Sequence, residues 1–251
     1  MRLQPVILAA GKGTRMQSEL PKPLFSVDGV PMLTRILATL EASKVALDPI
    51  IVVGDWTDAI QMQYGPQYQY AVQTELTGTA TAVAAALPYL DTSDEAPPVL
   101  ILYADHPFLT TATIQAMAAV SASAAPTIAM GTVTVPDFQE WRQPFAAFGR
   151  VVRDSAGKMQ KIVEAKNATD QELHITEVNP ALYCVQAAWL AATLPRIEQN
   201  PVTKEYYLTD LIELARLAGD VVTSVPIPPE EALGINSIAD AENAKQRQGE
   251  E

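Results

Sequence analysis

The stretch VILAAGKGTRM, residues 6–16, is an apolar run that gives way abruptly to two glycines, two cations and a threonine. The apolar half predicts a buried strand, and glycines after a first strand let backbone N–H groups approach a phosphate closely. Neither familiar phosphate loop fits, because a dinucleotide fingerprint needs a third glycine where Met16 stands and a P-loop needs GK[ST] after a four-residue gap. Two glycines alone are typical of an ordinary turn. Arg15 in the same loop, and Lys22 between two prolines, favour an anion site instead.

The composition and net charge of the chain limit the kinds of partner that it is expected to bind. It has 251 residues, a formal net charge of −12 and no apolar run of membrane-spanning length, so we expect a cytoplasmic protein that binds neither nucleic acid nor membrane. One cysteine and two histidines exclude an internal disulfide and argue against a zinc site built on these residues. Residues 1–22 differ from the rest of the chain, because four cations there accompany a single glutamate. An anion is therefore expected to bind near the N-terminus.

Alternating patterns in the first half predict parallel strands joined by crossover helices. Strands are expected at residues 6–8, 50–53 and 99–102, and helices from Pro31 to Leu40, over 78–87 and over 110–121. The second half predicts a hairpin of residues 148–154 and 159–164, a strand at 177–186, a helix at 206–217, a strand at 221–227 and a final helix from Ser237. We therefore expect one α/β domain, residues 1–236, followed by a helical tail, residues 237–251.

The N-terminal motifs LAAGKGTRM (8–16) and LPKPL (20–24) resemble the signature of the sugar-nucleotide pyrophosphorylases, specifically the N-acetylglucosamine-1-phosphate uridylyltransferase domain. The resemblance covers nearly the whole chain in the same order, through QTELTGT (73–79), LYAD (102–105), FGR (148–150), IVEAK (162–166), EVN (177–179), EYYLTD (205–210) and GIN (234–236). It implies a Rossmann-like mixed sheet of the nucleotide-diphospho-sugar transferase (glycosyltransferase A-type) kind. The hairpin would form a lid on the sugar side.

The resemblance implies a catalytic and metal-binding group. Arg15 and Lys22 would neutralise the triphosphate, which the chemistry also requires because nucleotidyl transfer brings two anions together. Asp105, at the end of a buried strand, and Asn236 would hold Mg²⁺ together with phosphates and waters. From local sequence alone, Lys22 also fits a solvated surface lysine, Asp105 a helix N-cap and Asn236 a helix entry.

The resemblance also implies two groups of substrate-binding residues. The nucleotide would lie against Leu8, Ala9, Ala10, Gly11, Gly13, Gln73, Gly78 and Thr79, with Gln73 and the Gly78-Thr79 pair contacting uracil. The sugar would contact Tyr103, Gly149, Glu164, Asn179, Tyr207 and Thr209. Local sequence alone leaves Gln73 equally an exposed strand end, and leaves both tyrosines equally core aromatics.

Several positions depart from the resembling domain, mostly on the sugar side. Ala80 and Thr81 replace a glycine and a histidine, Ala104 replaces a glycine, and His106 replaces a small apolar residue. Residues 179–181 read Asn-Pro-Ala instead of Asn-Thr-Gly, which removes a backbone donor and adds a methyl group beside the implied sugar pocket. Nucleotidyl transfer is therefore better supported than the identity of the sugar.

The sequence contains no hexapeptide repeats of the left-handed β-helix acetyltransferase domain that bifunctional relatives carry. We therefore expect no use of acetyl-coenzyme A, and a monomer or weak dimer.

The leading hypothesis is a Mg²⁺-dependent uridylyltransferase that joins UTP to a sugar 1-phosphate, with N-acetylglucosamine 1-phosphate as the first candidate, and releases pyrophosphate. The phosphate of the sugar is the nucleophile, which agrees with the absence of a nucleophile motif such as G-x-S-x-G. One alternative keeps the mechanism with another sugar, an alditol or a choline phosphate as acceptor. Another is a catalytically degenerate protein that binds nucleotide sugars.

Overall fold

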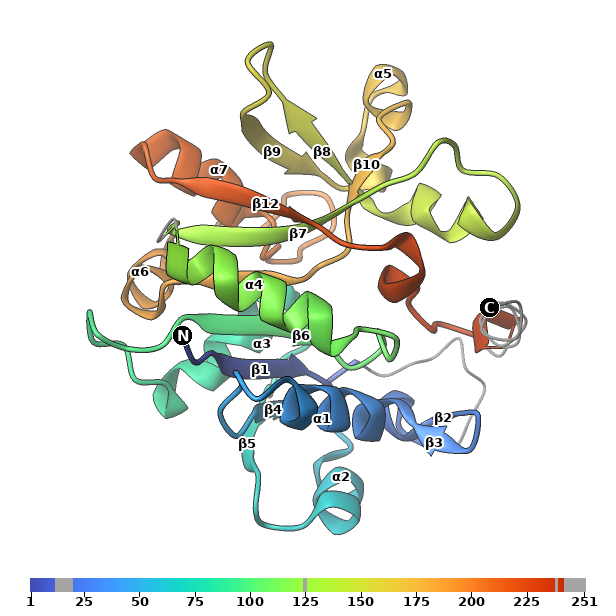
Figure 1. Cartoon of the computed structure of the whole chain (residues 1–251), viewed down its shortest axis with the longest axis vertical. Helices are drawn as coiled ribbons and strands as arrows, with labels where there is room; N and C mark the ends of the chain where they lie inside the picture. Colours follow the sequence, from blue (N-terminus) through green and yellow to red (C-terminus); the bar gives the residue numbers. More distant parts are fainter. Residues whose placement is uncertain (12–19, 124–125, 238, 242–251) are drawn as a thin grey trace.

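The computed structural model describes residues 1–11, 20–123, 126–237 and 239–241 (Figure 1). A mixed sheet of ten described strands lies at the centre, in the order β5-β4-β1-β6-β11-β7-β10-β8-β9, with β12 paired to β7. The strands are β1 (Gln4–Leu8), β4 (Ile50–Val53), β5 (Gln69–Val72), β6 (Val99–Tyr103), β7 (Ile128–Thr134), β8 (Gly149–Arg153), β9 (Met159–Val163), β10 (Glu177–Asn179), β11 (Tyr183–Val185) and β12 (Val222–Pro226). This is the α/β class with a mixed sheet that the sequence predicts.

Strands β5, β4, β1 and β6 are parallel and form one half of the sheet. Helices cover both faces of the whole sheet, and the central parallel strands are apolar on both sides. The first face carries α1 (Met32–Ser43), α2 (Thr57–Tyr64) and α4 (Thr111–Ser123), and the second carries α3 (Thr79–Ala86), α6 (Ala187–Thr193) and α7 (Asp210–Ala218). Successive residues of a strand point to opposite faces, so Ile7 packs in the first layer and Val6 in the second. The three strands predicted in the first half of the chain are confirmed.

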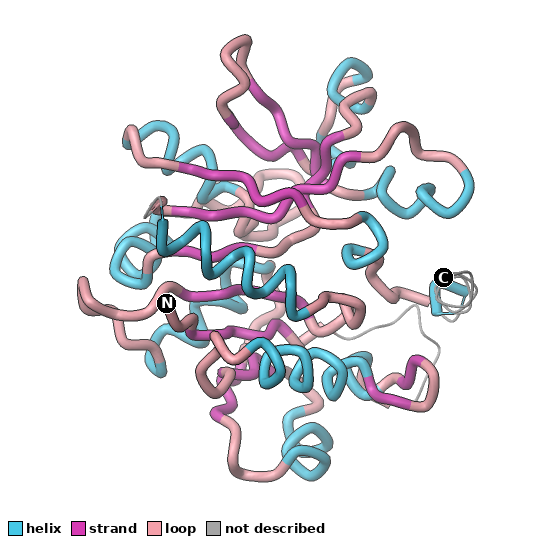
Figure 2. The backbone as a smooth tube through the Cα atoms, in the orientation of Figure 1, coloured by secondary structure: helices cyan, strands magenta, loops and turns pink. Residues whose placement is uncertain are grey.

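Strands β8 and β9 form the predicted hairpin, which extends the sheet at the edge opposite β5 (Figure 2). Asp154 closes its turn, because its side chain accepts hydrogen bonds from the backbone N–H groups of Ala156 and Lys158, both at 2.9 Å. Arg153 then donates to both carboxylate oxygens of Glu177 at 2.7 and 2.6 Å, which ties the hairpin to β10. The end of the hairpin that pairs with β10 is therefore held firmly in the sheet.

The single strand predicted at residues 177–186 is wrong, because the structure divides it into β10 and β11. Pro180 has no N–H to continue a ladder, and Ala181 adopts the left-handed region at φ 60°. The side chain of Asn179 stabilises this bend by accepting the N–H of Ala181 at 2.9 Å. As a result β10 pairs with β7 and β8, whereas β11 pairs with β6 and β7.

The helix predicted at residues 206–217 begins four residues late, since α7 starts at Asp210. The backbone of Tyr206 is bonded instead to the loop before α3: its N–H donates to Thr77 at 2.8 Å and its carbonyl accepts from Ala80 at 3.0 Å. The N–H of Leu208 donates to the hydroxyl of Thr79 at 3.0 Å. These contacts replace the helical hydrogen bonds that the periodicity predicts.

The start of the final helix agrees with the prediction, because residues 239–241 are helical and the N–H of Asp240 donates to the hydroxyl of Ser237 at 3.2 Å. Most of the expected tail, residues 242–251, lies outside the described residues. No helix in the described part of the chain is long and apolar enough to cross a membrane. Strands β5 and β7 and helices α2 and α6 are additions that the sequence patterns did not predict.

Candidate active site

A cavity of about 340 Å³ opens where β1 and β6 end, at the carboxyl edge of the parallel half of the sheet. Ligands of open α/β sheets bind at this edge, because loops and helix N-termini meet there. The lining residues come from β1 and the segment after it, η2 (Lys22–Leu24), the segment between β5 and α3, the end of β6, and the segment before α7. They are Leu8, Ala9, Ala10, Gly11, Lys22, Pro23, Gln73, Leu76, Gly78, Thr79, Ala82, Tyr103, Ala104, Asp105, Glu205 and Tyr207.

Lys22, Asp105 and Asn236 meet at one side of this cavity, although they lie far apart in the sequence. The ammonium of Lys22 donates to Oδ2 of Asp105 in a short ion pair and to Oδ1 of Asn236 at 2.7 Å. The lysine side chain is only 13% exposed, which fits a positioned cation rather than a solvated one. The backbone N–H of Ile235 donates to the carbonyl of Asp105 at 2.9 Å, and this contact brings Asn236 to the end of β6.

The pKa values in this cluster favour a charged carboxylate. Burial raises the pKa of Asp105, but the charge of Lys22, the neighbouring His106 and the hydrogen bond from Lys22 outweigh burial and lower it overall. Burial lowers the pKa of the His106 imidazole, against the opposing effect of Asp105. Asp105 is therefore ionised at neutral pH, next to the ammonium of Lys22 and a neutral imidazole.

The donor set at this point fits a Mg²⁺ ion. Oδ1 of Asp105 is buried and has no hydrogen-bond partner among the described residues, while Oδ2 and the amide oxygen of Asn236 converge on one cation, the ammonium of Lys22. Carboxylate and amide oxygens are hard ligands of the kind that Mg²⁺ prefers, with phosphates and waters completing its shell. The described residues contain no cluster of three or more His, Cys, Asp or Glu side chains for a metal ion. A metal here would therefore depend on the substrate for further oxygen ligands.

Gln73 forms the opposite side of the cavity, and the structure contradicts an exposed strand end, because the residue is only 7% exposed. Its amide nitrogen donates to the carbonyl of Gly78 at 3.1 Å and to the hydroxyl of Thr81 at 2.9 Å. Thr81, where the resembling domain has histidine, also donates to Gly78 at 2.9 Å. The orientation of the Gln73 amide is therefore fixed, with both of its N–H groups in use.

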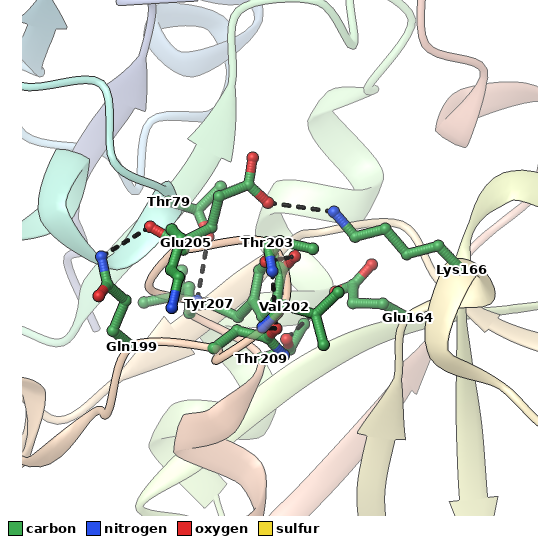
Figure 3. A network of polar contacts seen from close by, with 12 residues as sticks. Thr79, Glu164, Lys166, Gln199, Val202, Thr203, Glu205, Tyr207 and Thr209 are labelled. Atoms are coloured by element: carbon green, nitrogen blue, oxygen red, sulfur yellow. Dashed lines mark hydrogen bonds and ion pairs between the residues drawn. The ribbon is translucent and has the colours of Figure 1, made fainter.

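The loop before α7 contributes to the lining of the cavity, and Figure 3 shows the polar contacts of this loop. Glu205 and Tyr207 line the cavity, and the ammonium of Lys166 lies 3.1 Å from Oε2 of Glu205 and 5.0 Å from the ring centroid of Tyr207. The hydroxyl of Tyr207 is 2.6 Å from the hydroxyl of Thr203. The loop is thus held at one end by α3 and at the other by the segment after β9.

The residues implied for sugar binding divide into two sets. Tyr103 and Tyr207 line the cavity. The others lie beside it on the antiparallel half of the sheet: Thr209 donates to Oε1 of Glu164 at 3.1 Å, and Gly149 is directly opposite Asn179 in the β8–β10 register. Burial raises the pKa of Glu164, while the hydrogen bond from Thr209 opposes that rise.

Both polar atoms of the Asn179 side chain make hydrogen bonds within the protein. Its amide nitrogen donates to the hydroxyl of Tyr183 at 2.6 Å, and its oxygen accepts the N–H of Ala181 at 2.9 Å. The residue is 7% exposed. The Pro-Ala sequence after Asn179 therefore affects the asparagine side chain as well as the backbone. In the bend, the side-chain oxygen of Asn179 accepts the N–H of Ala181.

Two of the implied residues, Gly13 and Arg15, lie outside the described residues. Conversely, the structure adds Glu205 and Thr81 to the surroundings of the cavity. Glu205 is the first residue of the EYYLTD motif, and Thr81 differs from the residue in the resembling domain. Both positions were therefore noticed in the sequence, but neither was predicted to belong to this site. Ala80 and Ala104 have ordinary backbone conformations and bonded N–H groups, so glycine is not required at either position.

Comparisons with known proteins agree with this architecture. The MobA-like NTP transferase domain family matches residues 5–175. The bifunctional protein GlmU of Burkholderia ambifaria (strain MC40-6) is 40% identical over 250 residues, covering 96% of this chain and 52% of the relative. The GlmU of Brevibacillus brevis is 36% identical over 236 residues, covering 94% of this chain and 49% of the relative. The chain thus spans about half the length of the curated relatives it matches.

A solved structure of UDP-glucose pyrophosphorylase, complexed with UDP-glucose, aligns over 100% of both chains with a TM-score of 0.76 and 12% sequence identity. At this identity the likeness shows a shared fold, which is the nucleotide-diphospho-sugar transferase fold that the motifs imply. The family match covers the cavity lining from Leu8 to Asp105 and ends before the other two lining residues, Glu205 and Tyr207. The chain therefore belongs to the MobA-like NTP transferase family and is a nucleotidyltransferase that resembles the sugar-nucleotide pyrophosphorylases.

Proposed function

We propose that this protein is a Mg²⁺-dependent uridylyltransferase that forms a UDP-sugar and pyrophosphate from UTP and a sugar 1-phosphate. The observation that carries the proposal is the convergence of Lys22, Asp105 and Asn236 at the side of a cavity formed by the carboxyl end of β1. That arrangement supports a phosphate site, because it brings a cation and two oxygens of a metal-binding kind together beside the cavity. The motif resemblance over nearly the whole chain supports the same reaction.

The reaction joins two anions, and the residues of the cavity offset their repulsion. The phosphate of the sugar attacks the α-phosphorus of UTP in line with the departing pyrophosphate, so no covalent enzyme intermediate forms. Lys22 binds and neutralises the nucleotide phosphates, and Arg15 has the same role in the proposal. Asp105 and Asn236 hold Mg²⁺, which when bound neutralises charge that develops on the phosphate oxygens. Catalysis then depends on positioning and charge neutralisation.

The base is selected by the fixed amide of Gln73. Both N–H groups of this amide are bonded to Gly78 and Thr81, so its oxygen is the atom that interacts with the base. An accepting oxygen matches the N3–H donor of uracil and repels the N3 lone pair of cytosine. The backbone around Gly78 and the hydroxyl of Thr79 complete the base side of the cavity, above Leu8, Ala9, Ala10 and Gly11.

We predict that Gln73→Ala reduces the preference for UTP over CTP by about 10- to 100-fold, the range expected for one good hydrogen-bonded base contact. The measurement is kcat/KM for each nucleotide with the same acceptor. Gln115→Ala is the matched control, because the Gln115 amide donates to Ser43 on α1 instead of lining the cavity. An unchanged ratio in Gln73→Ala would show that the base is selected elsewhere.

The sugar is proposed to lie between the cavity and the antiparallel half of the sheet. Tyr103, Tyr207, Glu164 and Thr209 provide hydroxyl and carboxylate groups on this side, and the resemblance makes N-acetylglucosamine 1-phosphate the first candidate. A second candidate function keeps the mechanism with a different acceptor. It is favoured by Asn179, because bonds to Tyr183 and Ala181 fix its amide and leave at most one N–H and one lone pair for an acetamido group.

The experiment that separates these functions is a substrate panel with pyrophosphate release as the readout. UTP, CTP and dTTP are each paired with N-acetylglucosamine 1-phosphate, glucose 1-phosphate, an alditol phosphate and phosphocholine in the presence of Mg²⁺. We expect the highest kcat/KM for UTP with N-acetylglucosamine 1-phosphate. A higher value with another acceptor supports the second candidate, and no release from any pair would overturn nucleotidyl transfer by this chain.

A further inference from the structure

His106 is the least expected side chain near the proposed metal site, because the resembling domain has a small apolar residue there. The imidazole is 9% exposed. It stacks on Tyr103 with ring centroids 6.1 Å apart and on Phe148 with centroids 6.3 Å apart and planes only 5° from parallel. A buried ring held between two aromatic rings has little freedom, so the direction of its nitrogens is set by the fold.

The Nε2 atom of His106 is 3.8 Å from Oδ1 of Asp105, the buried oxygen that has no hydrogen-bond partner among the described residues. This separation is too long for a hydrogen bond. Two donors that each bind one ion at about 2.1 Å lie at most about 4.2 Å apart, so both atoms are within reach of a single ion.

Gly234 lies between the His106 imidazole and the Asn236 side chain. A Cβ atom at Gly234 would lie 3.0 Å from Nε2 of His106 and 3.5 Å from Nδ2 of Asn236. The absence of a side chain at this position therefore lets the imidazole and the Asn236 amide face one another across the backbone. The Asp105 carboxylate therefore has the His106 imidazole beside Oδ1 and the Lys22 ammonium, which also contacts Asn236, at Oδ2.

We propose that Nε2 of His106 is a third protein ligand of the divalent metal in this protein, beside Asp105 and Asn236. The inference rests on the metal role proposed for those two residues. It explains why a buried imidazole stands next to a buried carboxylate oxygen without a hydrogen bond between them. With His106 as a ligand, the protein would bind the metal through one nitrogen and two oxygens instead of through oxygens alone.

The nitrogen ligand changes which ions the site prefers. Carboxylate and amide oxygens suit Mg²⁺, whereas imidazole suits first-row transition ions, whose affinity for nitrogen rises from Mn²⁺ through Co²⁺ and Ni²⁺. The site should therefore bind Co²⁺ much more tightly than Mg²⁺, and this preference should depend on His106. Mg²⁺ remains able to bind through the oxygens.

The test measures metal binding directly, without nucleotide or sugar. Co²⁺ is titrated into the protein and followed by its visible absorption, and Mg²⁺ is measured by competition against bound Co²⁺. The variants are His106→Val and His106→Phe, the second of which keeps a ring between Tyr103 and Phe148 but has no nitrogen. His174→Phe is the matched control, because His174 is the other histidine of the chain and its Nδ1 contacts the carbonyl of Asp170.

We expect both His106 variants to bind Co²⁺ about 10- to 100-fold more weakly, with Mg²⁺ affinity changed by less than about threefold and no change in His174→Phe. Wild-type Co²⁺ affinity in His106→Phe, or an equal loss in His174→Phe, would overturn the inference. The variant Asp105→Asn distinguishes failure of the histidine-ligand inference from failure of the proposed metal site. If that variant loses affinity for both ions and His106→Phe for neither, the metal site stands and the histidine ligand fails. Unchanged binding in Asp105→Asn would refute the site itself.

Discussion

Replacing Lys22 by methionine is expected to lower kcat by about 10²- to 10³-fold, the effect typical of removing one preorganised group that stabilises transition-state charge. The ammonium is the cation that the described structure places at the cavity, bonded to both oxygens proposed to hold Mg²⁺. Methionine keeps most of the apolar stem of lysine and removes the ammonium, with its charge and its three N–H donors. The measurement is steady-state pyrophosphate release at saturating Mg²⁺.

The same variant should also change metal binding in the absence of substrate. In the wild type the ammonium contacts Oδ2 of Asp105 and Oδ1 of Asn236, so it competes with a metal for those atoms. Lys22→Met should therefore bind Mn²⁺ more tightly than the wild type while turning over more slowly. Lys161→Met is the matched control, because Lys161 also pairs with a carboxylate, Glu172 at 3.2 Å, but not in the cavity. Wild-type turnover in Lys22→Met would refute the proposed role of the lysine.

Gly78→Ala is expected to lower the free energy of unfolding by roughly 3 kcal/mol or more and to weaken nucleotide binding, because the position combines backbone strain with a direct clash. Gly78 adopts φ 133°, which side-chain-bearing residues rarely occupy, and a Cβ atom there would lie 2.3 Å from the carbonyl oxygen of Tyr206. The clash is with backbone, so it is relieved only by moving the loop before α7. Thermal or urea unfolding and the KM for UTP measure the two effects.

Gly157→Ala is the matched control for this change. Gly157 also has a positive φ, 79°, but a Cβ atom there would meet nothing within 4 Å. Its substitution should lower stability by only about 1 kcal/mol, the usual strain of a left-handed residue. Equal losses in the two variants would mean that the contact between Gly78 and Tyr206 contributes nothing beyond strain.

Three of the four strands in the parallel half, β1, β4 and β6, were predictable because the information that specifies them is local. Residues 50–53 are a continuous apolar run, and such runs indicate strands buried on both faces. The hairpin was equally predictable, because residues 155–157 are typical of a turn and lie between two strand patterns. In both cases the residues that determine the secondary structure lie within the element itself. Composition and periodicity are therefore sufficient to predict it.

The errors had two causes: contacts distant in sequence, and a local bend inside a strand-like pattern. Tyr206 lies in a pattern that predicts a helix, but its backbone is bonded to Thr77 and Ala80. Asn179 and Ala181 form a bend inside a strand-like pattern, because Pro180 between them cannot donate to the ladder. Strand β7 was not predicted, although it pairs with β10, β11 and β12. Its place in the sheet depends on partners that local patterns do not reveal.

The candidate site was predictable only through the motif resemblance. Nothing local connects Lys22 with Asp105 and Asn236, which are 83 and 214 residues away. The spatial meeting of these three residues is therefore an addition of the structure. The same holds for the network of Gln73 and Thr81, because the threonine hydroxyl that fixes the glutamine amide was noticed only as a departure from the resembling domain.

The most direct test of the central claim is Mg²⁺-dependent pyrophosphate release from UTP and N-acetylglucosamine 1-phosphate, compared between the wild type and Asp105→Asn. The substitution removes the charge of the buried carboxylate and preserves its shape. The account predicts release that requires Mg²⁺ in the wild type and falls by at least about 100-fold in the variant. The control Asp137→Asn, at a partly exposed ion pair with Arg142, should retain full activity. Equal release by the wild type and Asp105→Asn would contradict the account.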